Sequence, residues 1–263
     1  TILALAVGPV ITYALVPAGP EASEPGVTYL LAEDTITPYR MELVYAEVSD
    51  AITAITRRVR GSDLRAIEYT RLFDYYADRE TWGMENASQI LVAEYVATGE
   101  GTGIVHQAPA YGEDDQVTCA EAGIPVVISV DDAGRFLDQV SDVAGLQVFE
   151  ANKTLTGLLR TNGRLFAERS YDHSYPHCWR CRTPLIYKAD SSWFVRVTEI
   201  RDRMLELNEE ITWVPANVKD GQFGKWLSNA RDWSISRNRY WGSPIPVWKS
   251  DNPDFPRIDV YGS

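Results

Sequence analysis

Residues 101–115 read Gly-Thr-Gly-Ile-Val-His-Gln-Ala-Pro-Ala-Tyr-Gly-Glu-Asp-Asp. A turn of small residues leads into a short apolar run that ends at His106, and a loop shaped by Pro109 and Gly112 then carries three consecutive acids. Glycine lets a backbone approach a ligand closely, and carboxylates on a rigid loop suit a cation, either a metal or an ammonium group. The run therefore predicts a strand followed by a binding loop. The plainer interpretation is a polar surface turn after a strand.

The composition of the whole chain is that of an ordinary globular protein. The chain has 263 residues, of which 45% are hydrophobic and 24% charged, enough for one large domain or two small ones. Its formal net charge of −12 argues against a free-standing nucleic-acid binder, which normally shows a basic balance. A local basic patch exists all the same, because residues 225–241 hold Lys225, Arg231, Arg237 and Arg239 among three tryptophans.

Cysteine usage and hydropathy indicate a cytoplasmic protein. The three cysteines, Cys119, Cys178 and Cys181, form no disulfide framework and fit a reducing compartment. No stretch is long and apolar enough to span a membrane, and the apolar start at residues 2–16 lacks the features of a signal peptide. The chain begins without an initiator methionine, so we expect an internal piece of a longer protein.

Local patterns predict a mixed α and β fold. We expect strands at 2–7, 12–16, 27–31, 124–130 and 185–187, and a strand-forming run within 84–98. Helices are expected at 116–122, 152–163 and 192–208, and residues 39–56 could be a helix passing into a strand. Cys119 is expected to be a buried helix residue, and the eight tryptophans are expected mainly in the core.

The order of residues in 101–115 resembles the editing-site motif of isoleucyl-tRNA synthetases. In that family a Gly-Thr-Gly-Ile-Val-His segment precedes Ala-Pro-Ala-aromatic-Gly-Glu-Asp-Asp, and Tyr111 stands where Phe is frequent. Residues 171–184 and 229–248 also resemble family segments, the first just after the editing domain and the second where the chain returns to the nucleotide-binding fold. The family often has Cys at Ser234 and Gln at Asn238. The resemblance covers nearly the whole chain.

This resemblance implies roles for individual residues. The Asp115 carboxylate would hold the α-ammonium of a misattached amino acid, and His106 would position water, shape the pocket or act as a general base. Gly101, Thr102 and Gly103 would bind substrate, and in the intact enzyme Trp241 would lie near the aminoacylation pocket. The residue types alone leave plainer roles open. Asp115 could be the N-cap of a helix over 116–122, and His106 a strand-end histidine satisfied by backbone groups.

Cys178 and Cys181 have the spacing of half a tetrahedral zinc site. His173 and His177 are close in sequence, so a site of two Cys and two His within the chain is conceivable. In the family, however, the partner Cys-x-x-Cys lies before the editing domain, outside this chain. We therefore expect a half-site that holds zinc in the intact enzyme. The plain alternative is a reduced, unligated pair of thiols.

The resemblance also implies what the chain does and what it lacks. Residues 1–168 would be a β-rich, barrel-like editing domain surrounded by helices, and residues 169–263 a smaller, zinc-ribbon-like stem. The reaction would be hydrolysis of the ester that joins a misattached valine to the tRNA specific for isoleucine. A second pocket removes the smaller amino acid that the first cannot reject, an argument for which the isoleucine enzyme is the standard example. The expected partners are this charged tRNA and the remainder of the synthetase chain, with no membrane and a monomeric state.

Three family signatures are absent from the sequence. His-Ile-Gly-His and Lys-Met-Ser-Lys-Ser do not occur, so activation of isoleucine with ATP and Mg is expected only of the intact enzyme. The family's threonine-rich segment, Thr-Thr-Thr-Pro-Trp-Thr, is also missing, and its hydroxyls help to bind the terminal adenosine and orient water. Its absence predicts weak hydrolysis by this chain alone.

Two other functional classes stay open at this point. One is a metal-dependent hydrolase whose ligands are His106 and the acids of the 106–115 loop, namely Glu113, Asp114 and Asp115. The other is a non-catalytic tRNA-docking module built on residues 225–248. The first predicts a metal that is lost with Asp115, and the second predicts tRNA binding without ester cleavage.

Overall fold

The computed structural model describes residues 2–22, 24, 26–99, 101–170, 172–237 and 244–261. It divides into two compact units, Thr1–Ala189 and Asp190–Ser263, called the first and the second unit below. The expected boundary between an editing domain and a stem at 168/169 is a functional division and stays a prediction. Within the described ranges, no helix has both the length and the apolar character needed to cross a membrane.

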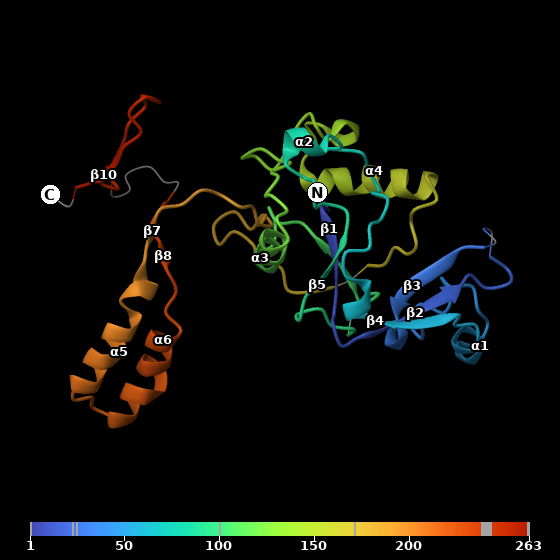
Figure 1. The fold of residues 1–263 in the computed structure, drawn as a ribbon, viewed down its shortest axis with the longest axis horizontal. Helices are drawn as coiled ribbons and strands as arrows, with labels where there is room; N and C mark the ends of the chain where they lie inside the picture. Colours follow the sequence, from blue (N-terminus) through green and yellow to red (C-terminus); the bar gives the residue numbers. More distant parts are fainter. Residues whose placement is uncertain are drawn as a thin grey trace. The chain divides into compact units, whose positions relative to one another are not determined.

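The first unit contains two three-stranded sheets with helices around them (Figure 1). Its strands are β1 (Ala4–Val7), β2 (Thr12–Pro17), β3 (Thr28–Ala32), β4 (Arg57–Arg60), β5 (Ile90–Val92) and β6 (Ile104–Gln107). Its α-helices are α1 (Val48–Thr53), α2 (Arg79–Trp82), α3 (Glu113–Glu121) and α4 (Val148–Thr161). Three short 3₁₀ turns join them: η1 (Glu33–Thr35), η2 (Gly61–Leu64) and η3 (Ser141–Val143).

The two sheets have simple topologies. In the first, β1 lies between β5, which runs parallel to it, and β6, which runs antiparallel. In the second, β2 lies between β3 and β4, both antiparallel. Among the described strands neither sheet closes on itself, so the expected barrel is not formed and the fold is α+β with small open sheets. The strands of three to six residues are too few per sheet for closure.

The two faces of the β5–β1–β6 sheet pack against different partners. One face contributes Leu91 to a core that also receives Cys119 from α3 and Ala151 from α4. The opposite face contributes Val7 and Ile90 to a second core, built with residues of the β3–β2–β4 sheet. Alternation along each strand produces this division, because successive side chains point to opposite faces. The helices therefore cover one face and the second sheet lies against the other.

The second unit is smaller and more exposed. It holds β7 (Phe194–Val195), η4 (Val197–Glu199), α5 (Arg201–Glu210), η5 (Ala216–Val218), η6 (Lys219–Phe223), α6 (Gly224–Ser228), β8 (Trp233–Ser234), β9 (Val247–Lys249) and β10 (Ile258–Val260). Strand β7 pairs with β8, and β9 with β10. The buried Asn208 joins α5 to the segment after it, because it accepts from Trp213 Nε1 at 2.9 Å and donates to the Lys219 carbonyl at 3.2 Å.

Several expected elements are corrected by the structure. Residues 124–130 form no regular strand. Ile124, Val127 and Val130 are buried at every third position, and the Ser129 amide bonds to the Tyr111 hydroxyl instead of a neighbouring strand. Residues 185–187 also form no strand, and an isolated bridge pairs the preceding residue, Pro184, with His177. Regular helix in 39–56 is limited to α1, and the helix expected over 192–208 begins only at Arg201.

The tryptophans are less buried than expected. Among the described ones, Trp179, Trp226, Trp233 and Trp248 are each about 60–70% exposed. Three of these four lie in the second unit, which has few large buried side chains to cover them. Cys119, in contrast, is fully buried in α3 as predicted, and burial raises the pKa of its thiol to about 12, with the charge on Asp115 adding to the effect.

Candidate functional site

The Gly101–Gly103 turn is fixed by contacts to the second sheet. The Thr102 carbonyl accepts a hydrogen bond from the Ala32 amide at 2.8 Å, and the Gly103 carbonyl accepts one from the Tyr13 hydroxyl at 2.6 Å. Both glycines have φ near +70°, and a Cβ at Gly103 would come within 2.6 Å of the Ala32 Cβ. Backbone conformation and packing account for these glycines. A direct role of the turn in binding substrate stays a prediction.

His106 lies on β6, directly opposite Leu5 of β1. Residues paired in this way share a face of the sheet. His106 therefore lies on the face that packs toward the β3–β2–β4 sheet, but at the edge strand, where the residue reaches solvent while protein atoms surround part of its ring. Within the described part of the chain no hydrogen bond reaches its imidazole. The structure therefore does not support the plainer role, in which the imidazole would form hydrogen bonds with backbone groups at the end of a strand.

Asp115 lies in the first turn of α3 rather than before it. The helix begins at Glu113 with Gly112 as its N-cap, so Asp115 is not the N-cap of a helix over 116–122. Its side chain folds back over Gly112, where an added Cβ would lie 2.9 Å from the Asp115 Cγ. There the Oδ2 atom accepts a hydrogen bond from the Ala108 amide at 2.9 Å. Asp115 is thus tied to the end of β6 and remains partly exposed.

The charge of Asp115 acts on the imidazole of His106. Surrounding protein atoms lower the pKa of His106, because burial disfavours the charged imidazolium even though part of the ring still meets solvent. The Asp115 carboxylate acts in the opposite direction and raises that pKa. The net shift is downward, so the imidazole is predominantly neutral at pH 7. A neutral imidazole beside a carboxylate can accept a proton from water while the carboxylate binds a cation.

Tyr95 is a part of this site that the sequence did not indicate. It follows β5, and its hydroxyl donates to the Gln107 Oε1 at 2.8 Å, while the buried Gln107 amide donates to the His106 carbonyl at 3.0 Å. Burial raises the pKa of Tyr95, hydrogen bonds to Thr118 and Gln107 lower it, and the charge on Asp115 raises it. Tyr95 therefore connects the strand of His106 with the helix of Asp115. A lone tyrosine in a strand-forming run carries no signal of this in the sequence.

Comparison with known proteins identifies the family to which the chain belongs. A family model described as tRNA synthetases class I (I, L, M and V) matches residues 32–258. The chain belongs to the class I tRNA synthetases. It is similar to the isoleucine–tRNA ligases of Leifsonia xyli subsp. xyli (65% identical) and of Corynebacterium diphtheriae (53% identical), with 100% and 99% of this chain covered. The chain spans only about a quarter of each relative, 24% in both cases.

One solved structure is also similar to this class I synthetase chain. It is described as the crystal structure of GlLeuRS-CP1, and it covers 61% of this chain and 74% of that chain with 12% sequence identity and a TM-score of 0.41.

The Cys178–Cys181 turn of this class I synthetase chain is well formed but supplies only two ligands. The Arg182 amide bonds to the Cys178 carbonyl at 2.9 Å, and the Cys181 Sγ lies 3.0 Å from the Thr183 Oγ1. The hydrogen bond from Thr183 lowers the pKa of the Cys181 thiol to about 7, which favours the thiolate that metals bind. The turn thus fits one half of a thiolate zinc site.

The alternative of a site made by two cysteines and two histidines of this chain is not assembled among the described residues. The His177 Nδ1 is engaged with the Tyr175 carbonyl at 2.8 Å, and the His173 Nδ1 lies 3.1 Å from the Ser174 carbonyl. Across the described ranges, no three His, Cys, Asp or Glu side chains are grouped as metal ligands. This applies to the cysteine turn and to the acidic 106–115 loop alike.

The remaining predicted residues lie in the second unit. Trp241 and Arg239 fall outside the described residues. Of the other members of the basic patch, Arg237 donates to the carbonyls of Ser234 and Ser236, and Lys225 lies in α6.

Proposed function

We propose that this chain carries the proofreading site of an isoleucine–tRNA ligase. This site hydrolyses the ester that joins a misattached valine to the tRNA specific for isoleucine. The observation that carries the proposal is the placement of Asp115, whose carboxylate is tied to the Ala108 amide beside His106, an imidazole with a lowered pKa. The relatives named isoleucine–tRNA ligase support it, since they match the chain over its full length. The finer description of the first unit as an editing domain belongs to this proposal.

Asp115 would bind the substrate through its charge. One carboxylate oxygen is held by the Ala108 amide, and the other has no hydrogen-bond partner among the described residues. A charge-assisted bond from that oxygen to the α-ammonium of the amino acid would distinguish an aminoacylated tRNA from an uncharged one. The rigid attachment of Asp115 to the end of β6 reduces the entropy that binding would otherwise cost.

His106 would act on the water. A neutral imidazole accepts a proton from the attacking water as its oxygen bonds to the ester carbonyl carbon. The bond between that carbon and the ribose oxygen then breaks, and the proton passes to the ribose oxygen, so that free valine and uncharged tRNA leave. Selection of valine over isoleucine would depend on the size of the pocket, which admits the smaller side chain only.

The intact enzyme would supply the rest. The remainder of the synthetase chain would provide activation with ATP and Mg, and a second pair of cysteines would complete a zinc site with Cys178 and Cys181. Bound zinc would crosslink this turn to another segment of the chain. We also propose a cytoplasmic, monomeric enzyme. The alternative of a metal-dependent hydrolase gains no support, because among the described residues the 106–115 loop gathers no set of three ligands.

The test is deacylation of valyl-tRNA and isoleucyl-tRNA, both made on the isoleucine acceptor. We expect cleavage of the valyl ester only, and a loss of at least about 100-fold in Asp115→Ala because a charge-assisted contact to the substrate disappears. Asp114→Ala is the matched control, since Asp114 is an exposed acid of the same helical turn, and its rate should be unchanged. Equal rates for Asp115→Ala and the unsubstituted chain would remove Asp115 from the site.

A further inference from the structure

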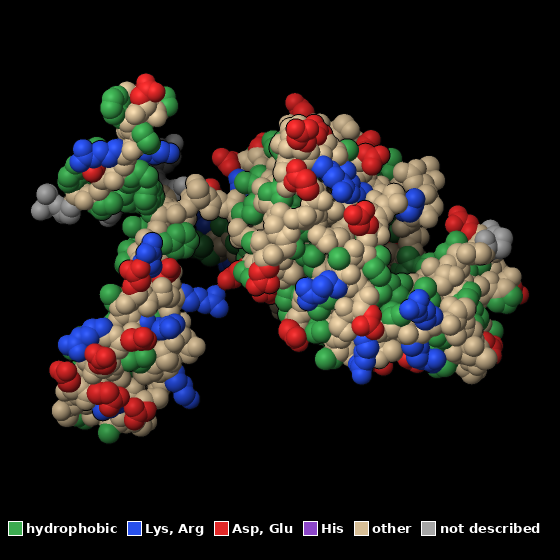
Figure 2. All heavy atoms as spheres, in the orientation of Figure 1, with side chains coloured by type: hydrophobic (Ala, Val, Ile, Leu, Met, Phe, Trp, Pro, Cys, Tyr) green, Lys and Arg blue, Asp and Glu red, His purple; other side chains and the backbone are tan. Residues whose placement is uncertain are grey.

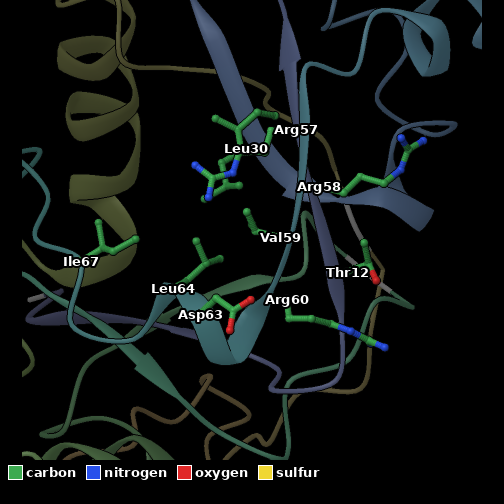
Figure 3. Close-up of a pocket in the computed structure, with 10 residues that line it drawn as sticks. Thr12, Leu30, Arg57, Arg58, Val59, Arg60, Asp63, Leu64 and Ile67 are labelled. Carbon is green, nitrogen blue, oxygen red and sulfur yellow. The ribbon is translucent and has the colours of Figure 1, made fainter.

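A groove and a cysteine turn of the first unit share no residue with the candidate site. The groove has a volume of about 540 Å³, lies between the β3–β2–β4 sheet and the η2 turn, and is lined by arginines, Asp63 and mainly aliphatic residues (Figure 3). Its described lining contains no cysteine or histidine. The Cys178–Cys181 turn, in contrast, presents two thiols, which oxidants convert readily. The turn is therefore the feature that can carry covalent chemistry.

The two cysteines stand three residues apart on a single closed turn. The Arg182 amide donates to the Cys178 carbonyl at 2.9 Å, and the Cys178 amide donates to the Thr183 carbonyl, also at 2.9 Å. Residues three apart in a tight turn have Cα atoms less than about 7 Å apart, and a disulfide spans about 4.4–6.8 Å. The backbone of the turn thus suits a bond between Cys178 and Cys181 without movement of other elements.

The side chains of the turn bring the two sulfur atoms close together. The Cys181 Sγ lies 3.0 Å from the Thr183 Oγ1. The pKa of Cys181 is lowered first by hydrogen bonds with Thr183 and then by one with the Cys178 thiol, so the two thiols are neighbours. Both cysteines are free rather than joined in a disulfide. The structure therefore shows the reduced form of a pair that is already in place.

Access and charge distinguish this pair from the third cysteine. Cys181 is exposed and Cys178 half-buried, whereas Cys119 is fully buried in α3. Over the face of the first unit seen in Figure 2, basic side chains are interspersed with acidic ones. Residues 176–187 contain Arg180 and Arg182 but no acid. Because nearby cations favour the reactive thiolate and apolar burial makes a thiol inert, an oxidant should react at the turn and not at Cys119.

We propose that Cys178 and Cys181 are a site of reversible oxidation by hydroperoxides, at which the two thiols form a disulfide. The Cys181 sulfur attacks one oxygen of hydrogen peroxide, the O–O bond breaks, and the hydroxide that leaves takes up the thiol proton to become water. The Cys178 sulfur then attacks the resulting sulfenic acid, so the S–S bond forms, the S–O bond breaks, and the hydroxide leaves with the Cys178 proton as a second water. The two cysteines lose the two electrons that the peroxide gains. A dithiol reverses the oxidation by exchange.

The disulfide and a bound metal exclude each other at this turn. Zinc binds thiolates, and neither sulfur atom of a disulfide is one. Oxidation would therefore remove the half of the zinc site that this chain supplies, and with it the crosslink to another segment. This consequence rests on the zinc site proposed above, whereas the oxidation itself does not.

The experiment treats the reduced, metal-free chain with hydrogen peroxide and then with iodoacetamide, followed by mass spectrometry of the intact chain and its peptides. We expect a mass loss of about 2 Da, protection of both turn cysteines from alkylation, and recovery of alkylation after dithiothreitol. Cys119 should remain reduced in the same sample, because it is buried. A main product with about 32 Da added at Cys181, as in a sulfinic acid, or a disulfide between two chains would overturn the inference.

Three variants sharpen the test. In Cys178→Ser the second thiol is missing, so excess peroxide should carry Cys181 on to the sulfinic acid, which dithiothreitol does not reduce. Oxidation of Cys178→Ser that is as reversible as that of the unsubstituted chain would show that the pair is not needed. Cys119→Ala is the matched control and should form the disulfide at an unchanged rate. Asp115→Ala, the test of the proposed function, should also form it normally, so either proposal can fail without the other.

Discussion

The 101–115 segment and the Cys178–Cys181 turn both carry family motifs, but the structure anchors the first by more contacts to other residues than the second. In 101–115 the turn is held by Ala32 and Tyr13, and Asp115 is held by Ala108. In the cysteine turn, the described residues add no third metal ligand to the two thiols. The difference shows that side chains on one strand and the following helix can be positioned by contacts to neighbouring strands of the same unit. A tetrahedral site needs ligands from a second segment.

We expect the largest effect on stability from a substitution in the turn before β6. Gly103→Val places a branched side chain at φ +75° and against the Ala32 Cβ, so we expect a loss of about 3 kcal/mol in the free energy of unfolding. Gly101→Ala is the control, because its φ is also positive but nothing lies within 4 Å of the new Cβ, and it should cost about 1 kcal/mol. Urea denaturation measures both. Equal losses would show that packing against Ala32 contributes nothing.

The second prediction concerns the incomplete site. Alkylation of Cys181 by iodoacetamide should reach half its maximal rate near pH 7, because the hydrogen bond from Thr183 lowers the pKa of the thiol to about 7. Thr183→Val should reduce the rate at pH 7 roughly fivefold. Equimolar zinc should protect Cys181 only weakly, since two thiolates are half of a tetrahedral set. Strong protection would mean that the chain supplies the other ligands itself.

The third prediction tests the electrostatics of His106 and Asp115. The pKa of His106 is lowered by burial, so its titration in an NMR experiment should have a midpoint below the ordinary 6.5. Because the Asp115 carboxylate raises that pKa, Asp115→Asn should move the midpoint lower still. If His106 acts as a base, deacylation should be constant above the midpoint and fall below it. A higher midpoint in Asp115→Asn would contradict the contact between the two groups.

The smallest effect is expected at Tyr95. Tyr95→Phe removes the hydroxyl that donates to Gln107, and should reduce kcat for deacylation several-fold with little change in KM, because His106 and Asp115 lose part of their alignment. It should also shift the titration midpoint of His106, which a purely structural role would leave in place. Phe73→Leu is a control for loss of aromatic packing elsewhere in the first unit. An unchanged kcat in Tyr95→Phe would exclude a positioning role.

Prediction from the sequence succeeded where short-range patterns decide the structure. Strands β1, β2 and β3 and helix α4 follow from apolar alternation or helical spacing, and the structure has them within a few residues of the expected bounds. It failed at 124–130, where the only β pairing among the described residues is an isolated bridge from Val130 to Phe136, and Ile124, Val127 and Val130 are buried at every third position. The expected barrel also failed, because closure depends on the pairing of distant strands.

The family motif, the order of β1, β2, β3, α3 and α4, and the chemical types at the site can be predicted from the sequence alone, namely a histidine on a strand and acids after it. How these residues meet depends on the tertiary structure. Cross-strand pairing with Leu5 set the face of His106, and the return of Asp115 to Ala108 set the position of the carboxylate. Tyr95 gained its neighbour Gln107 from the strand that follows in the chain. Such contacts depend on which strands pair across the sheet and how the helices pack on it, and a local pattern does not contain that information.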